Sequence, residues 1–253
     1  MQRSIRHKMI IQSLRTGGRM RVADLADLTG VSAVTIRRDL AELEGHGALR
    51  RVPGGAARTV KLGEEVPYRL RLAEDHDVKV ALAATVSGLI ADHESVIIDN
   101  GTTCHAVARE LAGRPITALC LSLHAAVALG ATPGARVIIP GGPVEPDTLA
   151  LNGSQAVDAV RAMQADALIT GACSASATRG LTSTLYEDAL IKQAGIRSST
   201  RRILVTIAAK LSRSANFRFG EPADLTHLVT TQDAPEDLLT LFRDEGVAVI
   251  LAS

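Results

Sequence analysis

The chain has 253 residues, 46% of them hydrophobic, and a formal net charge of +1. This composition excludes intrinsic disorder, and the length fits one large domain or a small and a medium one. The chain lacks a long apolar run and a signal-peptide pattern, so we expect a cytoplasmic protein with no membrane partner. Three widely separated cysteines, Cys104, Cys120 and Cys173, argue against a disulfide framework or a metal site, and we expect no cofactor.

The charge is distributed unevenly along the chain. Residues 1–60 hold 11 Lys and Arg against 5 Asp and Glu, whereas the remainder holds 17 against 22. A basic head on a mildly acidic body favours a polyanionic partner for the head, although chance clustering of solvated charges is the simpler alternative.

Residues 1–60 are predicted to form a winged helix-turn-helix domain. Apolar residues at helical spacing, glycine stops, a serine N-cap at Ser32 and a Pro-Gly-Gly turn carry this prediction. The expected elements are, in order, a helix around 5–14 ending at Gly17-Gly18, a short helix from Val22 to Gly30, a third helix closed by Gly47, a strand at 49–52, a turn at 53–55 and a possible return strand at 56–60.

Residues 61–76 show no clear period and are predicted to be a linker, which leaves 77–253 as the second domain. Short β-branched runs then alternate with helical stretches, which is typical of βα units around a mostly parallel sheet. The expected strands lie at 96–98, 116–121, 137–139, 167–169, 203–205, 227–229 and 247–251, and the expected helices at 78–90, 103–112, 123–130, 186–199 and 236–244. In such sheets, ligands bind in the loops that follow the strands.

The third helix of the head carries candidate DNA contacts. Because Ile36, Leu40 and Leu43 must face the bundle, the polar residues between them turn outward. They lie in the N-terminal half of the helix, which is the half that enters a major groove. Guanidinium groups grip phosphates or guanine, and hydroxyls bond bases or phosphates. The alternative is an exposed helix with ordinary surface arginines. The candidate contacts to double-stranded operator DNA are Ser32, Thr35, Arg37, Arg38, and Arg50 and Arg51 of the wing.

The candidate ligand site of the second domain is the stretch Asp99, Asn100, Gly101, Thr102 and Thr103, between a strand and a helix. Gly101 lets the backbone approach a ligand, and amides and hydroxyls at a helix start can cradle a phosphate. The alternative is an ordinary turn with a threonine N-cap. Gly141 and Gly142 follow the next strand but one and predict either a second ligand loop or a reverse turn.

The stretch from Val31 to Ala56, VSAVTIRRDLAELEGHGALRRVPGGA, resembles the signature of DeoR-type bacterial transcriptional regulators. It departs at Pro53, where the family more often has histidine, and the resemblance continues through the whole body. It implies a regulator, a repressor rather than an activator. We expect homo-oligomers, because a single recognition helix gives little affinity and paired heads read two half-sites. The body would be a sensor with the fold of ribose-phosphate isomerases, glucosamine-phosphate deaminases and CoA transferases, controlled by a small anionic, sugar-phosphate-like metabolite.

The resemblance also assigns residues to the sensor. In the family, the loop corresponding to Asp99–Thr103 is associated with sugar-phosphate binding. The stretch Gly180-Leu181-Thr182 with Asp188 and Lys192 is similar to another family segment, and Lys210 stands in register with the family lysine after the strand at 203–206. The resemblance therefore adds Asp188 and Lys210 to the candidate effector-binding residues.

Several positions depart from the family pattern. Cys120-Leu121 stands where the family usually has Thr-Asn, and Leu185 where it has asparagine. Ile207 and Thr231 each replace an aspartate. Polar groups that would bond sugar hydroxyls are therefore missing, so the expected effector is less sugar-like than is usual in the family, or the pocket is degenerate.

Two other classes of protein stay open from the sequence. A sugar-phosphate isomerase or deaminase with a vestigial head would need an acid and base pair, but Asp99 has no identifiable partner. Cys104 and His105 are adjacent on a helix, point roughly 100° apart and cannot pair as nucleophile and base, and the other histidines are scattered. We therefore expect no enzyme. An architectural DNA binder without an effector is the third class.

Overall fold

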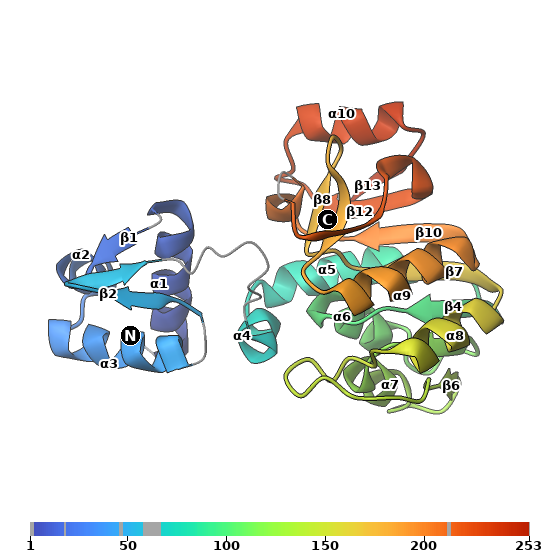
Figure 1. Ribbon diagram of the computed structural model, residues 1–253, viewed down its shortest axis with the longest axis horizontal. Helices are drawn as coiled ribbons and strands as arrows, with labels where there is room; N and C mark the ends of the chain where they lie inside the picture. The colour runs from blue at the N-terminus through green and yellow to red at the C-terminus, as the bar shows by residue number, and fades with distance from the viewer. Residues whose placement is uncertain (1–2, 18, 46–47, 58–66, 212–213, 253) are drawn as a thin grey trace. The chain divides into compact units, whose positions relative to one another are not determined.

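The computed structural model describes residues 3–17, 19–45, 48–57, 67–211 and 214–252 (Figure 1). The chain divides into two compact units, Met1–Glu74 and Asp75–Ser253. Each unit has a hydrophobic core of its own.

The first unit is the expected winged helix. Its elements are α1 (Arg3–Gly17), β1 (Arg19–Arg21), α2 (Val22–Thr29), α3 (Ala33–Gly45), β2 (Arg50–Val52), β3 (Gly55–Ala57) and α4 (Tyr68–Ala73). Residues from α1, α2 and α3 form its core, among them Ile10, Leu25 and Ile36, which are fully buried. The expected glycine stop at Gly47 and residues 58–60 of the return strand lie outside the described residues.

The turn between α2 and α3 is closed by Gly30, which adopts a left-handed φ of 67° and donates its N–H to the Ala26 carbonyl at 2.8 Å. Glycine adopts this conformation without a Cβ penalty, so the helix ends sharply. The Ser32 Oγ then accepts the Thr35 N–H at 3.3 Å, as expected of an N-cap.

A strand that the sequence did not predict, β1, completes the wing. The sheet order is β1-β3-β2, and both pairings with the central strand β3 are antiparallel. Strand β1 approaches β3 closely at Gly55, where a Cβ atom would lie 2.0 Å from the Met20 carbonyl oxygen. Only glycine fits between these backbones, so Gly55 is a packing requirement of the three-stranded sheet.

The second unit is an α/β domain with a seven-stranded sheet in the order β13-β12-β10-β7-β4-β5-β6, whose neighbouring strands all pair in parallel. Its strands are β4 (Ser95–Ile98), β5 (Thr117–Cys120), β6 (Arg136–Ile138), β7 (Ala165–Thr170), β10 (Ser199–Val205), β12 (His227–Thr231) and β13 (Ala248–Ala252). Its helices are α5 (His76–Ser87), α6 (Thr102–Glu110), α7 (Leu123–Leu129), α8 (Ser154–Ala162), α9 (Tyr186–Arg197) and α10 (Glu236–Asp244). The expected mostly parallel sheet is confirmed.

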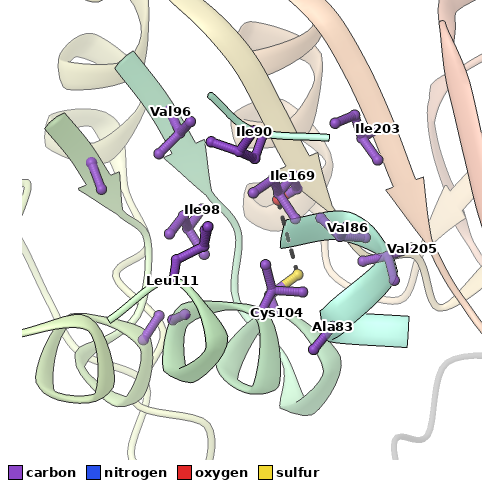
Figure 2. Packing of buried hydrophobic residues seen from close by; sticks show 14 of the residues in the cluster. Ala83, Val86, Ile90, Val96, Ile98, Cys104, Leu111, Ile169, Ile203 and Val205 are labelled. Carbon is purple, nitrogen blue, oxygen red and sulfur yellow. Dashed lines mark hydrogen bonds between the residues drawn. The ribbon is translucent and has the colours of Figure 1, made fainter. Parts of the chain in front are cut away.

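Side chains of the central strands alternate between the two faces of this sheet. Val96 and Ile98 of β4 pack with α5, α6 and α7, and Ile97 between them packs with α8 and α9. Figure 2 shows the first of these layers, with Cys104 of α6 pointing at the Ile169 carbonyl of β7. A sheet covered on both faces explains why its strands are near-continuous apolar runs in the sequence.

Besides β1, the structure differs from the sequence prediction in three places, one of which is the helix α8 (Ser154–Ala162), where no element was expected. The expected linker, 61–76, contains α4 and the start of α5, and α4 belongs to the first unit, with Leu70 packed against its core. A six-residue helix is too short to show a period. Strands β8 (Ser174–Ser176), β9 (Gly180–Ser183) and β11 (Phe217–Gly220) form a second, antiparallel sheet in the order β11-β9-β8, which was also not predicted.

Candidate functional site

The exposed face of α3 carries the arginines singled out in the sequence. Ile36, Leu40 and Leu43 are at most 1% exposed and fix the rotation of the helix, so Arg37 and Arg38 are exposed to solvent. Thr35 is half-buried, and its hydroxyl lies 3.0 Å from that of Ser32. The orientation needed for major-groove contacts is thus present. The contacts themselves stay a prediction.

An ion pair that the sequence did not reveal holds α3 against α1. The buried Asp39 carboxylate accepts hydrogen bonds from Arg6 Nε at 2.5 Å and Arg6 Nη2 at 3.0 Å, and lies 3.1 Å from His7 Nε2. Burial alone would raise the pKa of Asp39, but the hydrogen bonds from Arg6 and His7 bring that pKa below its ordinary value. These contacts join side chains more than 30 residues apart, so no local pattern marks them.

The two wing arginines have different surroundings. Arg50 stands opposite Ala57, and Arg51 stands opposite Ala56 of the core. Because successive side chains of a strand point to opposite faces, Arg50 and Arg51 project to different sides of the sheet. Arg51 also donates its N–H to Glu44 at 2.8 Å, and its guanidinium lies 3.9 Å from the same carboxylate.

The candidate ligand loop of the second unit lies where the order of the strands in the sheet reverses. From β4 the chain proceeds outward through β5 and β6, whereas β7 pairs with the other side of β4. The loops after β4 and β7 therefore flank a topological switch point, the usual ligand crevice of parallel sheets. There Gly101 has a φ of 102° and immediately precedes α6, which begins at Thr102.

Asp99 bridges the two loops at this point. Its Oδ1 accepts the Asn100 N–H at 2.8 Å. Its Oδ2 accepts the Thr170 hydroxyl at 2.7 Å, the Gly171 N–H at 3.0 Å and the Lys192 ammonium at 2.5 Å. The residue is 1% exposed, and burial raises its pKa against the opposing effect of Lys192.

Asp188 and Lys192, one turn apart on α9, complete this buried cluster. The Lys192 ammonium lies 3.0 Å from Asp188, and Asp188 also accepts hydrogen bonds from the Ser183 hydroxyl at 2.5 Å and the Asn100 amide at 2.7 Å. Burial opposes the charge of Asp188, but Lys192 and the hydrogen bonds bring its pKa below the ordinary value. Asp188 thus reaches the β4 loop through the Asn100 amide.

Lys210 lies at the same end of the sheet, in the short 3-10 helix at Ala208–Lys210 that follows β10. Its ammonium donates to the Ala172 carbonyl at 2.9 Å. The preceding residue, Gly171, faces the Asn100 carbonyl and the Cys104 sulfur. The structure therefore brings Lys210, the β7 loop and the start of α6 together.

Gly141 and Gly142 follow β6, the edge strand, and are both exposed. Gly142 faces Asn152 and Gln155 of the segment that follows in the chain. That segment then folds back over the end of β5, where Leu151 donates its N–H to the Leu121 carbonyl at 2.9 Å. A place for the two glycines in the ligand site stays a prediction.

The positions that depart from the family pattern differ in their surroundings. Cys120 and Leu121 are buried, and burial raises the pKa of the Cys120 thiol to about 12. Thr231 accepts the Ala208 N–H at 3.1 Å, next to Ile207. Leu185 precedes α9 without a side-chain cap and is 44% exposed.

Two histidines that looked scattered in the sequence are neighbours in space. His105 of α6 and His124 of α7 stack with ring centroids 5.6 Å apart and an interplanar angle of 20°. Burial lowers the pKa of both imidazoles. The pKa of His105 is lowered further by the neighbouring His124 and Arg109, which oppose a positive charge on its ring. Within the described ranges, no cluster of three metal-ligating side chains is present, and no helix is long and apolar enough to cross a membrane.

A winged helix with an arginine-bearing recognition helix, in one chain with an α/β unit whose switch-point loops suit a small anion, defines a DNA-binding regulator with a sensor unit. Two family models match the chain: the DeoR-like helix-turn-helix domain over residues 6–61 and the DeoR C terminal sensor domain over residues 74–232. The chain belongs to the DeoR family of transcriptional regulators.

Among curated proteins, the chain is 30% identical to an aga operon transcriptional repressor of Escherichia coli O157:H7, over 98% of this chain and 93% of the relative. It is 27% identical to the HTH-type transcriptional regulator UlaR of Shigella sonnei, over 97% of both chains. Both matches cover more than 90% of the relative and extend across both units of this chain.

Among solved structures, ribose 5-phosphate isomerase A of Methanocaldococcus jannaschii matches 55% of each chain with 14% identity and a TM-score of 0.41. The eIF2B beta subunit of Chaetomium thermophilum matches 95% of this chain and 70% of its own, with 12% identity and a TM-score of 0.46.

Proposed function

We propose that the chain is a transcriptional repressor that releases its operator when a small phosphorylated, sugar-like metabolite binds the sensor. The observation that carries this proposal is the convergence of the Gly101 loop, the first turn of α6 and the Lys210 ammonium at the switch point of the sheet. The name of one curated relative, an operon repressor, supports the direction of control.

In this proposal the phosphate contacts Gly101, Thr102, Thr103 and Lys210. Amides at a helix start and an ammonium group both stabilise a phosphate dianion. Asp99 and Asp188 act differently, because their carboxylates are buried and already accept hydrogen bonds from the protein. We assign them to holding the β4 and β7 loops in place, with Asn100 as the link between them.

The chain is proposed to act without catalysis. A sugar-phosphate isomerase would need a base that reaches a substrate proton, and both oxygens of Asp99 are engaged inside the protein. The enzyme with a vestigial head is therefore the weaker candidate. An architectural DNA binder is disfavoured because it would have no use for a sensor unit. Such a protein would be recognised by DNA binding without sequence preference.

We also propose that the chain forms homo-oligomers and acts in the cytoplasm, where operator DNA is present. A single recognition helix buries little surface and reads a short half-site, whereas paired heads read two half-sites about one helical turn apart. We therefore expect the operator to contain repeated half-sites.

The test of the DNA-binding surface is a gel shift with a duplex of the chain's own promoter, using Arg37→Ala and Arg38→Ala. Both side chains are exposed, so the variants should fold and melt like the wild type. Removing an arginine that reads a base should lower the affinity for DNA by about 10- to 100-fold and relax the sequence preference at one position. Removing an arginine that contacts a phosphate should instead flatten the salt dependence of binding. Unchanged affinity of both variants at physiological salt would contradict the assignment of α3.

A further inference from the structure

The stacked imidazoles of His105 and His124, which we call the imidazole pair, lie at the ligand end of the seven-stranded sheet. His105 belongs to the first turn of α6, which follows β4, and His124 belongs to the first turn of α7, which follows β5. These two strands are parallel neighbours, so both helices begin at the edge where ligands of parallel sheets bind. The two helices pack against each other on one face of the sheet (Figure 1).

His105 stands one helical turn beyond the glycine of the candidate ligand loop. Its N–H donates to the Gly101 carbonyl at 2.9 Å, which is the regular hydrogen bond of that turn. Side chains of a helix lean toward its N-terminus, so the His105 ring covers the turn that begins at Gly101 and Thr102. The ring and the proposed phosphate contacts are therefore separated by about 5 Å or less along the helix axis.

The surroundings of the imidazole pair favour uncharged rings in the free chain. Both rings are half-buried, and burial lowers the pKa of each. Arg109, one turn further along α6, also opposes a charge on His105. On the α7 side, the segment that hydrogen-bonds to the first residue of that helix carries two exposed acids, Glu145 and Asp147. Near pH 7.5 both rings are therefore neutral until an anion arrives.

The stacking limits how many protons the imidazole pair holds. The ring centroids are 5.6 Å apart, so two positive charges would oppose each other and the second proton binds less readily than the first. A phosphate dianion beside the rings favours the first proton, because an opposite charge nearby stabilises the charged form of a histidine. The pair is therefore suited to accept one proton next to a bound phosphate.

We propose that His105 and His124 belong to the phosphate site of the effector, and that together they take up one proton from solvent when the dianion binds. The proton resides on one ring and adds a positive charge to that of Lys210. This inference rests on the proposed function and deepens it, because it makes binding of the effector depend on pH.

The pH dependence of effector binding follows from the single proton. Uptake of one proton raises affinity for the dianion by at most about tenfold for each unit by which the pH falls. Between pH 8 and 7 a sugar phosphate stays mainly dianionic, because its second pKa is about 6. A sugar phosphate that weakens DNA binding should therefore bind about 3- to 10-fold more tightly at pH 7 than at pH 8. His105→Gln with His124→Gln should remove this difference.

The experiment that needs no identified effector is an NMR titration of the histidine rings of the full chain, in sulfate and in chloride of equal ionic strength. Sulfate is the probe because it stays a dianion across the titration. His105→Gln and His124→Gln assign the two resonances. The midpoint of the imidazole pair should be higher in sulfate by about one pH unit or more. In chloride, His124→Gln should raise the midpoint of His105, because the opposing ring is gone.

The matched control is His227, whose pKa is also lowered by burial but which begins β12, at the opposite edge of the sheet. Its midpoint should be the same in both salts, and Thr102→Ala with Lys210→Ala should abolish the response of the imidazole pair. Equal midpoints of the pair in sulfate and chloride, or an equal rise at His227, would overturn the inference. If the pair responds to sulfate but no phosphate changes DNA binding, the inference stands and the proposed function fails.

Discussion

Two carboxylates, Asp99 and Asp188, share the single ammonium of Lys192 in the interior of the sensor unit. All three residues are at most 7% exposed, and removing one partner of such a buried cluster leaves an unpaired charge. At the scale of residues, the ligand loop is therefore held by a charged network that reaches β4, β7 and α9. In the proposed function, this network holds in place the loop whose Gly101 backbone would approach the ligand.

The engagement of Asp99 leads to a prediction about catalysis. Its two carboxylate oxygens accept hydrogen bonds from Asn100, Thr170, Gly171 and Lys192, and the residue is 1% exposed, so we expect that a substrate proton does not reach them. We expect the purified chain to show no turnover of ribose phosphate or hexosamine phosphate in a coupled assay. A rate of about 1 per second or more that Asp99→Asn abolishes would contradict this account.

The residues of the sensor site were only partly predictable from the sequence. The Asp99–Thr103 loop could be placed because a glycine and two hydroxyls follow an apolar strand, a local pattern. The partner of Asp99 could not, because Lys192 is 93 residues away and nothing in its spacing marks it. The same holds for Asp39 with Arg6, and for the stacked His105 and His124.

At the scale of elements, Gly55 decides whether the wing exists as a three-stranded sheet. A methyl group there would lie 2.0 Å from the Met20 carbonyl oxygen, in backbone that cannot move without breaking the pairing of β1 with β3. Gly55→Ala should therefore lower the melting temperature and destabilise the first unit by about 2 kcal/mol or more. Isolated loss of the β1–β3 pairing would appear as faster amide exchange within the strands β1 and β3.

The control for this prediction is Gly45→Ala, in the same unit. A Cβ at Gly45 meets nothing within 4 Å and Gly45 is helical, so alanine there should be neutral or slightly stabilising. Equal stability of Gly55→Ala and Gly45→Ala would show that the approach of β1 to β3 is not what holds the wing.

Most of the longer elements followed the sequence prediction, whereas helix α8 and the strands β1, β8, β9 and β11 were not predicted. The buried strands of the seven-stranded sheet read as apolar runs because both faces are covered. By contrast, β1 is three residues long with two exposed arginines, and β8 is the small-residue run Ser-Ala-Ser. Their pairing partners, not their own residues, make them strands.

At the scale of the whole molecule, the account requires that the sensor unit and the DNA-binding unit be coupled in free energy. A ligand that binds more tightly to the DNA-free state lowers DNA affinity by the ratio of its two affinities. A typical coupling of about 1–3 kcal/mol corresponds to about 5- to 150-fold in operator affinity. The apolar replacements at Leu121 and Leu185 bear on which metabolite does this, whereas the residues proposed to contact a phosphate are all present in the chain.

The most direct test of this coupling is an anisotropy titration of the promoter duplex with the wild-type chain, in the presence of a panel of sugar and polyol phosphates. At least one phosphate should weaken DNA binding about 5- to 150-fold. Thr102→Ala with Lys210→Ala should keep DNA binding and lose that response, whereas Thr240→Ala, an exposed threonine of α10, should respond like the wild type. No response to any phosphate in the panel, or an equal response in the double variant, would contradict the account.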